Sequence, residues 1–151
     1  MVEINDRKLP VGIQSFEEIR KGGYLYVDKT DIIWQLANKG KTYNYLIRPR
    51  RFGKSVLVDT LEAYFMGKKE LFEGLKIMQM ETEWVKRPVI RLDMSRAGAE
   101  PETLRSYLDN TFDRLEKEYG ITPKTTAKLA DRFDAIIVGA YEQTGQQVAI
   151  L

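Results

Sequence analysis

The chain has 151 residues and a formal net charge of +2, with 43% hydrophobic and 30% charged residues, which is the ordinary composition of one globular domain. It contains neither cysteine nor histidine, which excludes disulfides, thiolate metal sites and catalysis by an imidazole. No apolar run has the length of a membrane span and the first residues lack a signal segment, so we expect a cytoplasmic protein without a membrane partner.

The first predicted elements are an extended segment, a helix and a strand. Residues 24–30 (YLYVDKT) predict a short strand or extended segment that ends at a helix cap. Thr30 and Asp31 can begin a helix whose apolar face continues to Gly40. Residues 42–47 (TYNYLI) are rich in aromatic and β-branched residues and predict a buried strand.

A phosphate-binding loop is predicted directly after this strand. Gly53-Lys54-Ser55 opens a helical pattern over residues 54–66, with Leu57, Leu61, Tyr64 and Phe65 on one side and Gly67 at its end. The backbone N–H groups at the start of a helix have no partner within it, and the helix dipole favours an anion there. Lys54 would reach the β- and γ-phosphates of a nucleotide, and the Ser55 hydroxyl would join the coordination shell of Mg²⁺.

Two features of the loop leave alternatives open. Arg48 stands where this motif usually opens with glycine, and the fixed φ of Pro49 can restrict the turn instead. The stretch from Lys39 to Ser55 has no acidic residue but six basic ones, namely Lys39, Lys41, Arg48, Arg50, Arg51 and Lys54. Such a stretch fits an anionic ligand, but it is also typical of a solvated basic turn, and Arg50 and Arg51 could contact phosphate or face solvent.

The second half of the chain predicts two more strands and two more helices. Residues 88–95 (PVIRLDMS) predict a strand, Pro101 opens a helix that Gly120 closes, and Thr122-Pro123 begins another helix. Residues 146–151 (QQVAIL) predict a third strand. Strands that alternate with helices predict a parallel sheet covered on both faces. Because the sequence ends inside an apolar run, we expect a truncated piece of a longer protein.

Several of these segments together resemble the bacterial AAA-ATPase-like family of P-loop proteins. The resemblance runs from Leu9 to the end and is most distinctive in YVDKT and RPRRFGKS, and this family tolerates a residue other than glycine at position 48. It implies an α/β fold, a three-layer P-loop NTPase-like parallel sheet flanked by helices, here incomplete. It implies ATP and Mg²⁺ as cofactors, with Ser55 on the metal and the nucleotide bound by the loop residues Pro49, Arg50, Arg51, Phe52, Gly53, Lys54, Ser55 and Val56.

The resemblance also points to residues upstream of the loop. In related P-loop ATPases this stretch wraps the adenine, which here implies contacts from Ile13, Phe16, Tyr26, Val27 and Asp28. The alternative is that Tyr26 and Val27 pack against the first helix, and the sequence does not separate the two. Trp34 and Trp84 are predicted to be packing residues.

The family implies further properties of a longer protein. There, a strand such as VAIL runs into an acidic Walker B motif, so without those carboxylates this chain is expected to hold phosphates but to hydrolyse ATP poorly. Asp93 is expected to cap or pair locally rather than to bind magnesium. Members commonly carry a nuclease domain further on, which makes DNA a possible partner of the longer protein, and an incomplete sheet with exposed edges predicts homo-oligomers.

Three functional hypotheses remain from the sequence. The first is a nucleotide-binding ATPase module. The second is a module whose basic stretch contacts the phosphates of DNA or RNA. The third is a degenerate P-loop fold that serves as a scaffold for protein interactions.

Overall fold

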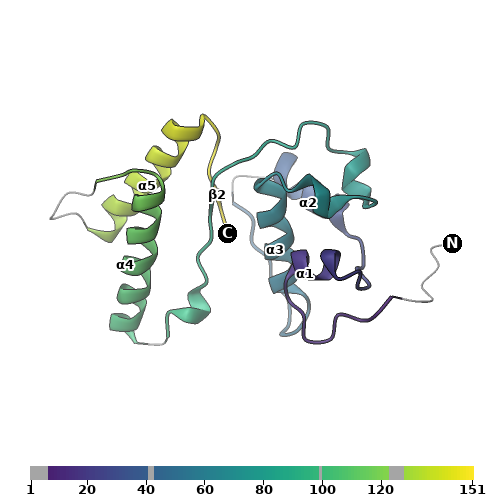
Figure 1. Ribbon diagram of the computed structural model, residues 1–151. Helices are drawn as coiled ribbons and strands as arrows, with labels where there is room; N and C mark the ends of the chain where they lie inside the picture. Colours follow the sequence, from purple (N-terminus) through teal and green to yellow (C-terminus); the bar gives the residue numbers. More distant parts are fainter. Residues whose placement is uncertain (1–6, 41–42, 99, 123–127) are drawn as a thin grey trace. The chain divides into compact units, whose positions relative to one another are not determined.

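The computed structural model describes residues 7–40, 43–98, 100–122 and 128–151, and the chain forms two compact units, Met1–Lys86 and Arg87–Leu151. Both units are rich in helices, and the strands of the described residues lie in the second unit (Figure 1). None of the described helices is both long and apolar enough to span a bilayer.

The first unit consists of three α-helices and two short 3₁₀ helices. They are α1 (Phe16–Lys21), α2 (Thr30–Asn38), α3 (Lys54–Phe65), η1 (Lys69–Phe72) and η2 (Lys76–Gln79). The side chain of Ser15 caps α1 by accepting the N–H of Glu18, and α3 ends before Gly67, whose φ of 69° is left-handed.

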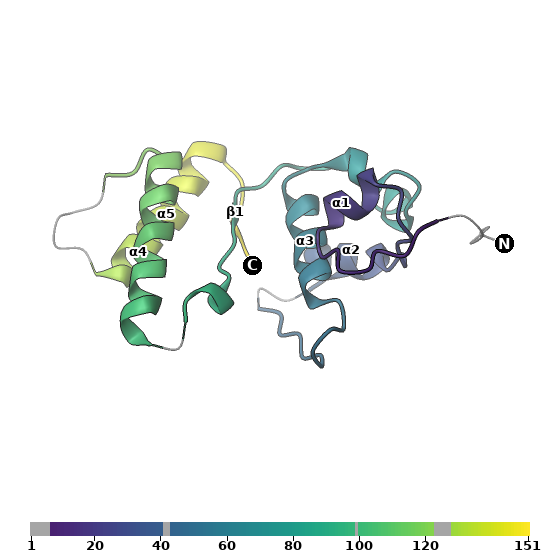
Figure 2. The same cartoon turned by 60° about the horizontal axis from the view of Figure 1, so that its bottom comes forward.

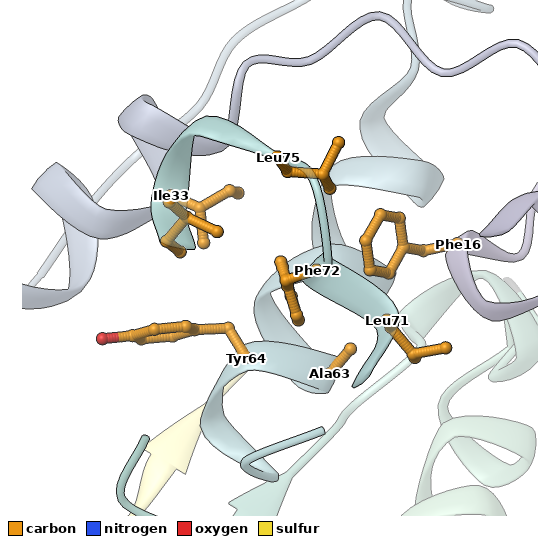
Figure 3. Close-up of a cluster of buried hydrophobic side chains, with 8 residues drawn as sticks. Phe16, Ile33, Ala63, Tyr64, Leu71, Phe72 and Leu75 are labelled. Carbon is orange, nitrogen blue, oxygen red and sulfur yellow. The ribbon is translucent and has the colours of Figure 1, made fainter. Parts of the chain in front are cut away.

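A cluster of buried apolar side chains holds these elements together. Figure 3 shows side chains from α1, α2, α3 and η1 converging, among them Phe16, Ile33, Tyr64 and Phe72. The ring of Phe16 lies 5.0 Å from that of Phe72, and both side chains are fully buried. Each fully buried side chain of this size contributes about 1.5–3 kcal/mol to the hydrophobic free energy of folding. The predicted packing of Trp34 and Trp84 is confirmed, since both lie against this cluster.

Helix α3 contacts the cluster from Leu57 onward, and its fully buried residues lie in its second half. Its buried residues are Thr60, Ala63 and Tyr64, whereas its first residues, Lys54 and Ser55, are exposed. The Asp59 carboxylate, midway along α3, accepts the N–H of Phe16 at 3.1 Å and so caps α1. The core therefore fixes the axis of α3 and leaves its N-terminal turn accessible.

Asp28 and Thr30 join the start of α2 to η2. One carboxylate oxygen of Asp28 accepts hydrogen bonds from the N–H and the hydroxyl of Thr30, and the other accepts the N–H of Lys76 at 2.7 Å. The buried Thr30 hydroxyl also accepts the N–H of Ile77. Partial burial acts to raise the pKa of Asp28, but these hydrogen bonds outweigh it and hold the pKa below its ordinary value.

The second unit pairs two parallel strands with two long helices. Its elements are β1 (Val89–Ile90), η3 (Met94–Arg96), α4 (Pro101–Glu118), α5 (Leu129–Thr144) and β2 (Ala149–Ile150). In the sheet Val89 aligns with Ala149 and Ile90 with Ile150. Figures 1 and 2 show α4 and α5 together on one side of the strands, and Ile90 packs there with Phe112, Leu115 and Ile136.

Most predicted elements are present. The helices expected from residues 54 and 101 are confirmed, and so is their closure at Gly67 and Gly120. The strands expected over 88–95 and 146–151 are confirmed as the shorter β1 and β2, which are parallel. The predicted helix start at Thr122-Pro123 cannot be compared, because Pro123 lies outside the described residues.

The predicted buried strand over residues 42–47 is wrong for residues 43–47, and Thr42 lies outside the described residues. The segment carries no strand pairing, and Tyr43, Tyr45 and Ile47 are 92%, 91% and 79% exposed. A strand requires a neighbour for its backbone N–H and C=O groups, and the described sheet contains β1 and β2 alone. The described residues therefore form a helix-rich α/β arrangement with a two-stranded parallel sheet.

Arg132 links α4 to α5 through three acidic residues. Its guanidinium contacts the carboxylates of Asp109, Asp113 and Glu116 at 2.6–2.9 Å and lies 5.7 Å from the centre of the Phe112 ring. The Glu116 side chain is only 6% exposed. Its charge therefore depends on Arg132 for compensation.

We predict that Arg132→Ala lowers the free energy of unfolding by about 3 kcal/mol, because it leaves the buried Glu116 carboxylate without its cation. The matched control is Arg105→Ala, whose 76% exposed side chain lies 3.9 Å from Asp109, and it should cost less than about 1 kcal/mol. Urea unfolding followed by circular dichroism measures both variants. Equal losses of unfolding free energy in the two variants would contradict the dependence of the Glu116 charge on Arg132.

We predict that Asp28→Ala lowers the free energy of unfolding by about 2 kcal/mol at neutral pH, because three hydrogen bonds to a charged acceptor are lost. The folded state lowers the pKa of Asp28, so the contribution of this carboxylate is full above its ordinary pKa and disappears as the pH falls through the lowered one. The difference in unfolding free energy between the wild-type chain and the variant should therefore become smaller as the pH falls.

Asp31→Ala is the control for Asp28, since Asp31 lies in the first turn of the same helix and its interaction with the helix dipole is worth about 0.5 kcal/mol. Thermal melts at neutral and acidic pH test both variants. A difference between wild type and Asp28→Ala that does not change with pH would be inconsistent with the proposed hydrogen-bonded carboxylate.

Candidate functional site

The loop before α3 has an unusual backbone. Gly53, the N-cap residue, has φ 71° and ψ 20°, and Arg51 has φ 64°, so two left-handed residues flank Phe52. The Cβ of an arginine strains a left-handed backbone conformation, and residues other than glycine that adopt it are uncommon outside turns and functional sites. All residues from Pro49 to Ser55 are exposed, so the amides of this turn are near solvent.

Gly53 is required by its conformation rather than by crowding. A Cβ placed on it would meet no atom within 4 Å, although its positive φ disfavours any side chain. The space beside this residue is therefore open to a ligand.

The N-terminus of α3 lacks the usual capping groups. No side chain caps it and no acidic residue lies in its first turn, whereas the first turns of α1, α2, α4 and α5 all contain an acidic residue. The first backbone bond of α3 runs from the N–H of Leu57 to the carbonyl of Gly53. The N–H groups of Lys54, Ser55 and Val56 thus precede the hydrogen-bonding ladder of the helix, and they are suited to an anionic acceptor.

Basic residues lie before and at the start of α3 in the sequence. Arg50, Arg51 and Lys54 are exposed and Arg48 is half-buried. The Lys54 ammonium donates a hydrogen bond to the carbonyl oxygen of Arg48 at 3.1 Å, which closes the loop on itself. The nearest acidic residue downstream is Asp59, which is engaged with the N–H of Phe16. The charge of the loop is therefore positive and has no carboxylate within it.

The upstream residues expected near adenine have protein partners. Phe16 is fully buried in the core, and the ring of Tyr26 meets it edge-on at 5.1 Å. Burial raises the pKa of the Tyr26 hydroxyl. Val27 is 70% exposed, and Asp28 joins α2 to η2 as described above. The packing alternative thus has contacts that support it at Tyr26, and adenine contact stays a prediction.

Asp93 caps a short helix, as the sequence led us to expect. Its carboxylate accepts the hydroxyl and the N–H of Ser95 at the start of η3, and the hydroxyl's hydrogen bond lowers its pKa. Within the described ranges, no three acidic residues come together as a metal-binding group.

Two features of the site have no signal in the sequence. Nothing in an arginine predicts the left-handed conformation of Arg51, since glycine and asparagine are the residues that usually adopt it. The hydrogen bond from Lys54 to the carbonyl of Arg48 depends on the path of the loop backbone, which composition does not specify.

Comparisons with known proteins found a matching family and a related protein. A family model described as predicted AAA-ATPase matches residues 10–151. An uncharacterized protein in the vnfD 5′ region of Azotobacter chroococcum mcd 1 is 37% identical over 148 residues, which cover 96% of this chain and 28% of that relative. The chain thus spans little more than a quarter of the length of that relative. No solved structure matches the chain.

We predict that Arg51→Gly raises the free energy of unfolding by up to about 1 kcal/mol, because relief of left-handed strain exceeds the added entropy of the unfolded chain. Arg50→Gly is the matched control: it removes the same charge at a residue without positive φ and should cost about 0.5–1 kcal/mol. Urea unfolding without ligand distinguishes them, and an equal loss for both would contradict strain at Arg51.

Proposed function

Because this chain belongs to the predicted AAA-ATPase family, we propose that its loop from Pro49 to Val56 binds the phosphate groups of a nucleotide, with ATP as the expected ligand. The observation that carries the proposal is the N-terminus of α3, which is exposed, uncapped and free of acidic residues. A bound phosphate would supply the acceptor that these backbone N–H groups lack, in a position that the helix dipole favours.

Each loop residue has a separate role in this proposal. The N–H groups from Phe52 to Val56 would donate to phosphate oxygens, and Pro49, which has no N–H, would shape the turn. The Lys54 ammonium would exchange the Arg48 carbonyl for a β- or γ-phosphate oxygen. Arg50 and Arg51 are exposed and can add charge-assisted hydrogen bonds to the same phosphates.

Mg²⁺ is the cofactor that such a ligand would bring. The Ser55 hydroxyl lies exposed in the first turn of α3, where it can take one coordination position. Mg²⁺ commonly keeps several waters and binds through one or two protein groups and the phosphates, so a single serine fits this role. Bound there, the ion would neutralise phosphate charge.

Tyr26 and Asp28 would have to exchange protein contacts for direct contact with the nucleotide. Tyr26 packs on Phe16, and both carboxylate oxygens of Asp28 accept protein hydrogen bonds. Ile13 and the exposed Val27 remain available for apolar contact with a base.

We extend the proposal to the longer protein that the matched relative represents. A three-layer P-loop fold, ATP hydrolysis, association through sheet edges and contact with DNA all belong to that proposal. It is supported by the family and by the parallel pairing of β1 with β2.

We predict that Lys54→Ala abolishes stabilisation by Mg-ATP, because it removes the ammonium group that neutralises the phosphates. If ATP binds the wild-type chain, a concentration of 100 times the dissociation constant should stabilise it by about 2.7 kcal/mol. Lys69→Ala is the control, since Lys69 is an exposed lysine in the first turn of η1 in the same unit.

Thermal melts and isothermal titration with ATP, with and without Mg²⁺, measure these effects. Wild-type protein that is folded but unaffected by millimolar Mg-ATP would refute nucleotide binding by this chain. Equal ATP affinity in wild type and Lys54→Ala would place the nucleotide elsewhere.

A further inference from the structure

The segment from Tyr43 to Lys54, here called the basic–aromatic segment, exposes aromatic rings as well as positive charge. The side chains of Tyr43 and Tyr45 are 92% and 91% exposed, and Phe52 is 61% exposed. Figure 2 draws the segment as a trace that reaches α3 without forming a strand. Large aromatic side chains usually bury most of their surface, so two tyrosines this exposed suggest a contact surface.

Positive charge accompanies these rings. Arg48, Arg50, Arg51 and Lys54 lie in the same segment, and the sequence has no acidic residue between Lys39 and Ser55. A partner that covers this segment must therefore be anionic. A second copy of the chain would bring like charges together at the same place, which disfavours association through this segment.

We propose that the basic–aromatic segment binds single-stranded nucleic acid, whose bases stack on Tyr43, Tyr45 and Phe52 while its phosphates contact the arginines. Proteins that bind single strands combine these two elements, aromatic platforms and a basic track along the backbone. An acidic peptide would pair with the positive charges but would not require the exposed aromatic rings. Paired duplex bases are already stacked, so their faces are not available to the tyrosines.

The order of residues fits this division of labour. Tyr43 and Tyr45 precede the cations, and Phe52 lies among them. Tyr43 and Tyr45 are two residues apart and both side chains are more than nine-tenths exposed, so both rings are accessible to the bases of one strand. Arg50, Arg51 and Lys54 are shared with the nucleotide loop, whereas the two tyrosines are outside it. Mg-ATP should therefore compete with the oligonucleotide for the cations without using the tyrosines.

The test is fluorescence anisotropy of a labelled oligothymidylate of roughly ten nucleotides, a length within the usual site size of such proteins. We predict that the double variant Tyr43→Ala/Tyr45→Ala binds it at least about tenfold more weakly, because two stacking contacts are lost. Tyr43→Phe/Tyr45→Phe should bind like wild type, since stacking requires the ring and not the hydroxyl. Tyr141→Ala removes a 53% exposed tyrosine of α5 and is the matched control.

The salt dependence of binding distinguishes the contribution of the aromatic rings from that of the charged side chains. The slope of log affinity against log salt should be unchanged in the double alanine variant and reduced by about one in Arg50→Ala. Circular dichroism melts check folding, and the exposure of both tyrosines predicts little change in stability.

The proposal would be overturned by no binding of wild type at low salt, by alanine variants that bind like wild type, or by heparin bound as tightly as the oligonucleotide. Sedimentation that shows self-association lost in the alanine variant would also overturn it, because a second copy would then cover the rings. Failure of ATP binding with intact oligonucleotide binding would reject the nucleotide proposal alone.

Discussion

The burial of the second half of α3 is the constraint on which the site depends. Thr60, Ala63 and Tyr64 lie in the core of the first unit, and Asp59 binds the first N–H of α1. A helix is stiff along its axis, so anchoring one half also orients the other. The exposed N-terminal turn is therefore presented in a fixed direction although none of its own residues is buried. The loop can be open to ligands because the packing that holds it lies one to two turns away.

Electrostatics and conformation reinforce each other at this helix end. The absence of a first-turn acid and the left-handed Gly53 both leave backbone N–H groups directed toward solvent. Arg51 adds a strained conformation that ordinary packing does not require. Together these features support the proposal that the loop binds phosphate.

The helices and their ends could be predicted from the sequence, but the absence of strand pairing in residues 43–47 could not. Periodic apolar residues and Gly67 and Gly120 predicted α3 and α4 closely, since local chemistry determines where such helices end. The segment YNYLI has the composition of a buried strand, but pairing depends on a neighbour that composition cannot supply. For the same reason the sequence predicts a phosphate-binding loop by its motif, yet not the conformation of Arg51 or the partners of Asp28, which arise from the folded backbone.

If phosphate binds as proposed, the hydrogen bond from Lys54 to the carbonyl of Arg48 would make binding an exchange of acceptors. This hydrogen bond restricts the Lys54 side chain before a ligand arrives, which would spare the ligand part of the cost of about 0.5–1.5 kcal/mol for ordering it. To draw the ammonium away, an incoming oxygen must be a stronger acceptor than a neutral carbonyl, and an ionised phosphate oxygen is. A nucleoside without phosphates offers no such oxygen, so the loop would discriminate against it before any contact with the base.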